Sequence, residues 1–141
     1  MHPSPLLAPV VALVAWTIVM LFWMAAARYR IVKGRKIPDG ARGDYLEREA
    51  PGPAHWPCHN YNHLMEQPTI FYAIVFALIL MGFDAPINVW LAWGYVGFRV
   101  LHSLVQATVN KVAIRFPLFL LGSLCLVALT THAALRLLLH G

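Results

Sequence analysis

Polar side chains recur at helical spacing within two otherwise apolar segments of the sequence. The intervals are four and then three residues in the first segment, and three, four and four in the second, so each set lies on one face of a helix. The two sets are His59, His63 and Glu66, and Arg99, His102, Gln106 and Asn110. Ionisable groups inside a membrane cost about 2.5 to 3.5 kcal/mol each on insertion scales, so they need partners or a wet cavity. The two stripes predict either a ligand-binding site or a set of buried pairs that join the helices.

The two stripes match in height if their helices form an antiparallel hairpin. Facing positions on such a hairpin have residue numbers with a constant sum, and three pairs meet this condition: Glu66 with Arg99, His63 with His102, and His59 with Gln106. With a rise of 1.5 Å per residue, Glu66 and Arg99 differ in height by about 4 to 5 Å, which long side chains can span. The sequence therefore predicts that Glu66 and Arg99 are in direct or near-direct contact. Such a pair would fix the register of the two helices, and this role does not exclude ligand binding.

The elements that must position these residues are membrane helices. The chain has 141 residues, of which 60% are hydrophobic and 12% charged, whereas about a quarter of the residues in a soluble domain are charged. A single domain over residues 1–141 is expected at this length. Apolar runs and chain breakers predict an all-α, integral membrane four-helix bundle with helices over residues 6–27, 58–82, 87–110 and 116–139. Pro68 falls inside the second helix and is expected to kink it locally.

Positive charge is concentrated in one connection of this bundle. The sequence has 11 Lys and Arg against 6 Asp and Glu, a net charge of +5. Seven of the basic residues lie in the Gly- and Pro-rich segment 28–57, namely Arg28, Arg30, Lys33, Arg35, Lys36, Arg42 and Arg48. Under the positive-inside rule this segment is a cytoplasmic loop and both termini lie outside. The basic pI therefore reports topology, and nucleic acid is not an expected partner.

The residues around the polar stripes resemble those of a known family. The run 60–68 (Asn-Tyr-Asn-His-Leu-Met-Glu-Gln-Pro), the run 99–102 (Arg-Val-Leu-His) and Arg115 look like the bacterial branch of the MAPEG family, the membrane-associated proteins in eicosanoid and glutathione metabolism. The four-span layout and the long first loop also match, so the resemblance covers nearly the whole chain. It implies a homotrimer of four-helix protomers that binds glutathione between subunits, near the cytoplasmic side.

The resemblance also implies roles for individual residues. Arg115 matches the arginine that holds the glutathione sulfur and is the implied catalytic residue. A permanent cation near sulfur lowers the pKa of a thiol from about 8.5 and raises the fraction of nucleophilic thiolate. The implied glutathione-binding residues are His59, Asn62, His63, Glu66, Arg99, His102 and Gln106. No metal site is expected. An alternative role for Arg115 is that of a loop charge set by the positive-inside rule.

Four of these positions depart from the family pattern. Gln106 stands where the family usually has tyrosine, and His63 stands where it has asparagine. His59 and Asn62 stand where characterised members often have arginine. The departures remove two permanent cations and a phenol from the implied site, so they weaken the prediction of activity more than the prediction of family.

The predicted function is that of a glutathione-dependent membrane transferase or peroxidase acting on a lipophilic substrate that enters from the bilayer. The expected partners are this small molecule, membrane lipid and further copies of the chain, and the expected location is the bacterial inner membrane. The alternative from another class is a non-catalytic membrane lipid- or ligand-binding protein of the same fold. A third reading is a small transporter that uses Glu66 as a proton carrier.

Overall fold

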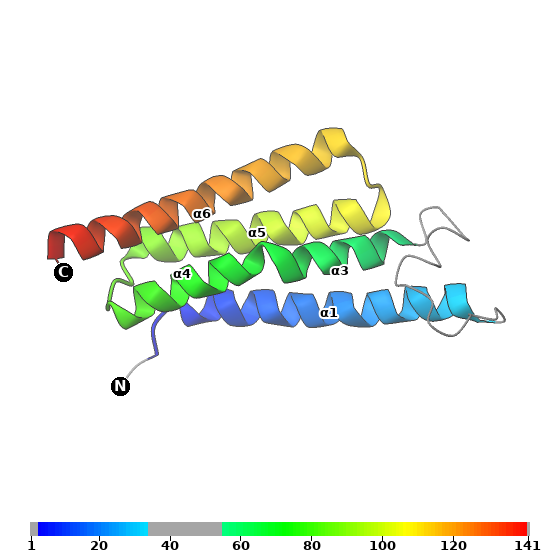
Figure 1. The fold of residues 1–141 in the computed structure, drawn as a ribbon, viewed down its shortest axis with the longest axis horizontal. Helices are drawn as coiled ribbons and strands as arrows, with labels where there is room; N and C mark the ends of the chain where they lie inside the picture. The colour runs from blue at the N-terminus through cyan, green and yellow to red at the C-terminus, as the bar shows by residue number, and fades with distance from the viewer. Residues whose placement is uncertain (1–2, 34–54, 141) are drawn as a thin grey trace.

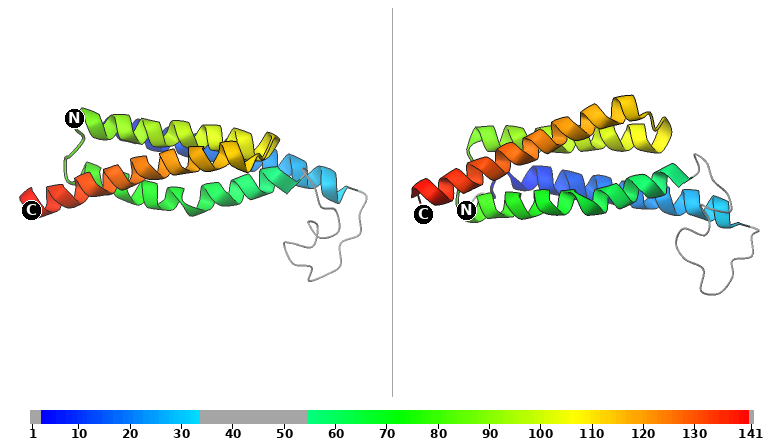
Figure 2. Two further views of the ribbon diagram at one scale, coloured as in Figure 1. Left: turned by 90° about the horizontal axis from the view of Figure 1, so that it is seen from above. Right: turned by 45° about the horizontal axis from the view of Figure 1, so that its top comes forward.

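Helices account for all regular structure in the part of the chain that the computed structural model describes, residues 3–33 and 55–140. They are α1 (Leu7–Val32), α3 (Trp56–Glu66), α4 (Pro68–Leu80), α5 (Pro86–Thr108) and α6 (Val112–His140). The helices run side by side along one long axis (Figures 1 and 2). The expectation of an all-α fold is confirmed for these residues.

The chain passes back and forth along this axis. α1 and α5 run in one direction, and α3, α4 and α6 run in the other (Figure 1). The start of α1 and the end of α6 therefore lie at one end of the bundle, called here the terminal end. The end of α1, the start of α3 and the α5–α6 connection lie at the opposite end, called here the loop end (Figure 1). Most of the expected loop over 28–57 cannot be compared with the structure, because residues 34–54 fall outside the described ranges.

The second predicted helix is divided in two at Gln67. A single kinked helix over 58–82 was expected, whereas α3 ends at Glu66 and α4 begins at Pro68. Proline has no N–H, and its ring clashes with the carbonyl four residues earlier, so the helical ladder is interrupted there. Gln67 itself keeps helical dihedrals (φ −64°, ψ −40°). The chain therefore continues in nearly the same direction, with a bend between α3 and α4 (Figure 1).

Two helices extend further toward the loop end than the sequence predicts. α1 continues past residue 27 to Val32, because no Gly or Pro interrupts the chain before Gly34. α6 begins at Val112 instead of residue 116, and Pro117 lies inside it. A proline in the second turn loses only one hydrogen bond, to the carbonyl of Ala113, so the helix tolerates it. Part of the expected loop 28–57, and residues 112–115 of the expected connection between the third and fourth helices, are thus helical.

The packing of the helices differs from a simple hairpin of the second and third predicted spans. The most extensive packing is between α5 and α6, α3 packs against both α1 and α5, and α4 packs against α6. Phe71 of α4 stacks on Tyr95 of α5, with ring centroids 4.5 Å apart. The core around this pair consists of fully buried side chains, including Leu13, Val75, Leu78 and Leu129.

Within residues 3–33 and 55–140, two helices are long and apolar enough to cross a membrane. They cover Leu7–Arg30 and Val112–Leu139, while α4 is a shorter apolar helix. Both long helices expose large hydrophobic side chains, such as Phe22, Leu124 and Val127. These side chains suit contact with lipid or with another protein surface. α5 is less apolar because one of its faces carries the polar stripe.

Candidate functional site

One face of α5 is both polar and buried. The buried residues recur at the spacing of a single helical face: Asn88, Ala92, Tyr95, Val96, Arg99, His102, Ser103, Gln106 and Ala107. Arg99 is 2% exposed, and His102 and Gln106 are each 3% exposed. The face is buried because α5 packs against α1, α3 and α6. The structure therefore brings three of the predicted binding residues, Arg99, His102 and Gln106, together inside the bundle.

The polar side chains of α3 differ in how far they are buried. Asn60 is fully buried and His59 is half-buried, whereas Asn62 and Glu66 are exposed. His63 belongs to α3, but its side chain lies outside the described part of the structure. Of the predicted α3 site residues whose side chains the structure describes, His59 is thus half-buried, and Asn62 and Glu66 lie at the surface.

Glu66 and Arg99 interact electrostatically, and Arg99 also interacts with Tyr95. The guanidinium carbon of Arg99 lies 6.0 Å from the centroid of the Tyr95 ring, at the outer limit of a cation–π contact. The two members of the predicted pair differ sharply in burial, because Arg99 is inside the bundle and Glu66 is at its surface. The expectation of direct contact between them stays a prediction.

Several buried polar atoms near this face find no hydrogen-bond partner among the described residues. They are both side-chain amide atoms of Asn60, the hydroxyl of Ser103 and the amide oxygen of Gln106. A buried amide or hydroxyl left unpaired costs about 1 to 3 kcal/mol, so native proteins rarely retain one without a purpose. The atoms belong to α3 (Asn60) and α5 (Ser103 and Gln106), and a polar ligand or water with donor and acceptor groups would satisfy them.

A hydrogen-bonded chain joins the α3–α4 junction to α5 and α6. The Tyr95 hydroxyl donates to Gln67 Oε1 at 3.3 Å, and Gln67 Nε2 donates to Ser123 Oγ at 3.0 Å. The Ser123 hydroxyl in turn donates to the carbonyl of Phe119 at 2.9 Å. Gln67 therefore holds the break between α3 and α4 at a fixed position in the bundle.

Arg115 lies in the first turn of α6, directly after the α5–α6 connection. Its Nη1 donates to Asn110 Oδ1 at 2.6 Å. Asn110 has a positive φ of 53°, and its N–H donates to the carbonyl of Val105. Asparagine is one of the few non-glycine residues that adopt this left-handed conformation readily, and the conformation commonly ends a helix. The end of α5 thus positions the arginine at the start of α6.

Arg115 and His102 line the same pocket at the loop end of the bundle. The pocket has a volume of about 180 Å³, and its other lining residues are Val112, Phe116 and Phe119. The ring of Phe119 is tilted against that of His102, with centroids 6.3 Å apart. The pocket therefore combines a permanent cation and an imidazole with an apolar wall. This combination suits a small anionic or thiol group next to a lipophilic one.

Sequence reasoning did not find every polar residue of this region. Tyr95 and Ser103 continue the four-residue spacing of Arg99 on α5, so that spacing was a usable signal. Gln67 precedes Pro68, where a helix break frees backbone groups and favours a polar side chain. No local pattern distinguishes Ser123, because it lies in an apolar helix and is defined only by its contact with Gln67.

The helices and the buried polar groups together define a class of protein, an α-helical membrane bundle with a polar site at one end. The family model of the MAPEG family matches residues 6–135, so the chain belongs to that family. The family includes glutathione transferases and peroxidases as well as non-catalytic members. No curated protein and no solved structure matches the chain. The predicted family is thus confirmed.

Proposed function

We propose that the protein is a glutathione-dependent membrane transferase or peroxidase that acts on a lipophilic substrate. The observation that carries the proposal is the shared pocket of Arg115 and His102 at the loop end. Members of the MAPEG family generally use glutathione. Glutathione supplies a thiol, which attacks an electrophilic carbon or reduces a peroxide. The chain's own part is to bind the tripeptide, stabilise the thiolate and admit the lipophilic partner.

The residues present fit these tasks. Arg115 provides a permanent positive charge beside which a thiol loses its proton more readily. The unpaired atoms of Asn60, Ser103 and Gln106 offer donors and acceptors that a peptide-like ligand can satisfy. Phe116 and Phe119 form an apolar wall on which a lipophilic substrate can lie. Arg99 is a buried cation near these groups and suits a carboxylate of the tripeptide.

The size of the pocket supports a site shared between protomers. Ligand pockets usually measure about 300 to 1,000 Å³, which exceeds the roughly 180 Å³ between α5 and α6 of one chain. Exposed polar residues on α3, Asn62 and Glu66, are available to a neighbouring subunit. A homotrimer that binds glutathione at its subunit interfaces accounts for both features. Native mass measurement in several detergents tests the trimer, and a persistent monomer or dimer contradicts it.

The orientation of the bundle is part of the same proposal. The end of α1 and the start of α3 lie at the loop end (Figure 1). Seven Lys and Arg fall within residues 28–57 of the sequence, so the positive-inside rule puts that end in the cytoplasm. Both termini then lie outside, and the polar site opens toward the cytoplasmic supply of glutathione. A bacterial inner membrane is the proposed location.

The second candidate is a non-catalytic ligand-binding member of the same family. One observation favours it, because Arg115 is already engaged by Asn110 at 2.6 Å. The family arginines are absent at His59 and Asn62, and the tyrosine is absent at Gln106. In this reading the pocket binds a lipophilic or anionic molecule without chemistry.

The experiment that separates the two candidates measures both binding and turnover. Purified protein in detergent is assayed for conjugation of glutathione to an aryl halide and for reduction of a lipid hydroperoxide, with thermal unfolding measured at increasing glutathione. The Arg115→Ala variant should lose about 100-fold in turnover, the usual scale when one donor at a developing charge is removed. Arg28→Ala is the matched control, since Arg28 is an exposed arginine on α1. A thermal shift with glutathione but no turnover indicates the non-catalytic candidate. The absence of both a thermal shift and turnover overturns the glutathione proposal.

A further inference from the structure

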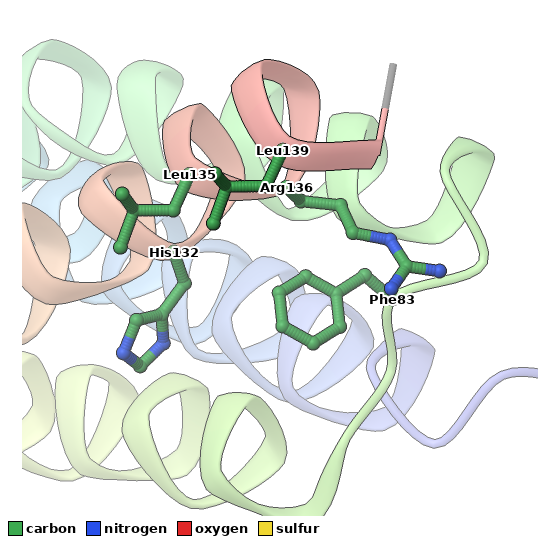
Figure 3. Close-up of a pocket in the computed structure, with 5 residues that line it drawn as sticks. All are labelled: Phe83, His132, Leu135, Arg136 and Leu139. Atoms are coloured by element: carbon green, nitrogen blue, oxygen red, sulfur yellow. The ribbon is translucent and has the colours of Figure 1, made fainter.

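A second pocket lies at the terminal end of the bundle, far from Arg115. It has a volume of about 190 Å³ and is lined by Phe83, His132, Leu135, Arg136 and Leu139. Phe83 belongs to the α4–α5 turn, and the other residues belong to the last turns of α6 (Figure 3). In Figure 3 the ring of Phe83 lies between the side chains of His132 and Arg136. The pocket thus has one cationic side and one apolar side.

The guanidinium of Arg136 lies over the ring of Phe83 on the pocket wall. Its central carbon lies 5.1 Å from the centroid of the Phe83 ring, within the range of a cation–π contact. A cation–π contact uses none of the N–H donors of the guanidinium in hydrogen bonds, so these donors stay available to an anion. No carboxylate within residues 3–33 and 55–140 forms an ion pair with Arg136. The neighbouring acid, Asp84, accepts a hydrogen bond from the Ser4 hydroxyl at 3.3 Å.

The opposite wall of the pocket is held in place by hydrogen bonds. Nδ1 of His132 lies 2.7 Å from Oδ1 of Asn88, and Nδ2 of Asn88 donates to the carbonyl of Phe83 at 3.1 Å. Asn88 is fully buried. One asparagine therefore fixes both the imidazole on α6 and the backbone of the turn that carries Phe83. The pocket is a preorganised feature of the fold.

If α6 crosses the bilayer from its first turn, the position of Arg136 along the helix puts this pocket at the level of lipid headgroups. The helix begins at Val112, so Arg136 lies about 36 Å along it at 1.5 Å per residue, beyond a hydrocarbon layer of about 30 Å. Leu135 and Leu139 are 47% and 72% exposed, and they continue the apolar surface of the helix. Arg136 is also the only Lys or Arg after residue 115 in the sequence. A single arginine at this end of α6 is a candidate for contact with a lipid phosphate, which arginine binds through charge-assisted hydrogen bonds.

We propose that this pocket binds the phosphate of an anionic membrane phospholipid, with the acyl chain lying along Leu135 and Leu139. Arginine suits phosphate because its planar N–H groups form paired, charge-assisted hydrogen bonds. Leu135 and Leu139 favour a lipid over free phosphate, because they add binding free energy only for a ligand that carries an acyl chain. The proposal is independent of the glutathione site, which lies at the other end of the bundle.

The test counts the lipids that the full chain retains. The protein is purified in detergent, phosphatidylglycerol is added, and native mass spectrometry measures bound lipid per protomer. Arg136→Gln should retain one lipid fewer per protomer than the unmodified protein, with an affinity about tenfold or more weaker for that lipid. Arg136→Lys should bind the lipid more tightly than Arg136→Gln and more weakly than the unmodified protein, because lysine keeps the charge and loses the paired N–H groups. Arg30→Gln, an exposed arginine at the loop end, is the matched control and should bind as the unmodified protein does.

A second arm distinguishes a lipid from a free anion and guards against misfolding. Inorganic phosphate should not raise the midpoint of thermal unfolding, whereas phosphatidylglycerol should raise it by several degrees in an Arg136-dependent way. Leu139→Ser keeps the cation and should still weaken lipid binding. Equal lipid counts in Arg136→Gln and Arg30→Gln overturn the proposal, as does a phosphate response equal to that of the lipid. Unfolding without lipid is measured for each variant, so that a folded Arg136→Lys keeps the test valid if Arg136→Gln does not fold.

Discussion

Arg115 donates a hydrogen bond from Nη1 to Oδ1 of Asn110 over 2.6 Å, across the connection between α5 and α6. Asn110 is also the one non-glycine residue with positive φ in the described ranges. A single residue therefore does two things at once, since its backbone ends α5 and its side chain holds the cation of the pocket. The two tasks can be separated by substitution, because glycine preserves the backbone conformation and alanine does not.

Asn110→Gly should retain most of the stability of the protein, because glycine adopts positive φ without strain. The variant releases Arg115 from its hydrogen bond, so the position of the cation becomes less fixed. If the protein turns over glutathione, kcat should fall about 10-fold while the midpoint of thermal unfolding changes little. Kinetic assays and thermal unfolding of the same sample measure both. An unchanged kcat indicates that Asn110 does not position Arg115 for catalysis.

Asn110→Ala should lower both kcat and the stability of the protein. A non-glycine residue without a local hydrogen-bonding side chain pays about 1 to 3 kcal/mol in the left-handed region. The free energy of unfolding of this variant should therefore fall below that of Asn110→Gly by an amount in this range. Equal stabilities of the two variants would mean that the connection relaxes to another conformation.

The hydrogen bond between Gln67 and Ser123 should make a measurable contribution to stability. A double-mutant cycle of Gln67→Ala and Ser123→Ala is expected to give a coupling free energy of about 0.5 to 1.5 kcal/mol, the scale for hydrogen bonds between membrane helices. The measurement is unfolding in detergent titrated with a denaturing surfactant. Thr131→Ala combined with Gln67→Ala is the control, since the Thr131 hydroxyl bonds only to its own helix. A coupling free energy near zero in the test pair, equal to that of the control, would mean that the hydrogen bond between Gln67 and Ser123 does not stabilise the protein.

The buried stripe of α5 was predictable because its signal is local. Arg99, His102 and Gln106 recur at helical intervals among apolar residues, and any helix with that pattern must bury the polar face against partners or expose it to water. The structure buries it. The family was predictable for the same reason, since most of its motif residues lie in two short runs, one on α3 and one on α5.

The rest of the arrangement depends on contacts between residues far apart in the sequence. Gln67 and Ser123 are separated by 56 residues, and Asn88 and His132 by 44. No spacing rule within a helix relates such residues, because their meeting depends on how α4, α5 and α6 pack. The exposure of Glu66 was missed for a related reason, since matching heights do not determine the rotation of each helix about its axis.

The difference in burial between Glu66 and Arg99 leads to an asymmetry in mutational effect. Arg99→Ala should lower the free energy of unfolding by about 2 to 5 kcal/mol, because it leaves a cavity and removes the interactions of the guanidinium with Tyr95 and Glu66. Glu66→Ala should change it by less than about 0.5 kcal/mol, as is usual for exposed positions. Unfolding of both variants in detergent tests the asymmetry. Similar losses for the two would instead indicate a direct carboxylate–guanidinium pair, as the sequence predicts.

Asn60 and Asn88 allow the final prediction, because the two asparagines are equally buried and differ in their partners. Asn88 bonds to His132 and to the carbonyl of Phe83, whereas both amide atoms of Asn60 lack a partner among the described residues. Replacing a satisfied buried amide with an apolar group leaves other atoms unpaired, while replacing an unsatisfied one removes a cost. Asn88→Leu should therefore destabilise the protein by about 1 to 3 kcal/mol, and Asn60→Leu should leave stability unchanged or raise it. If Asn60 serves a peptide-like ligand, Asn60→Leu should at the same time weaken glutathione binding about 10-fold, as seen by the thermal shift. Loss of stability in Asn60→Leu with an unchanged shift would assign Asn60 a structural role instead.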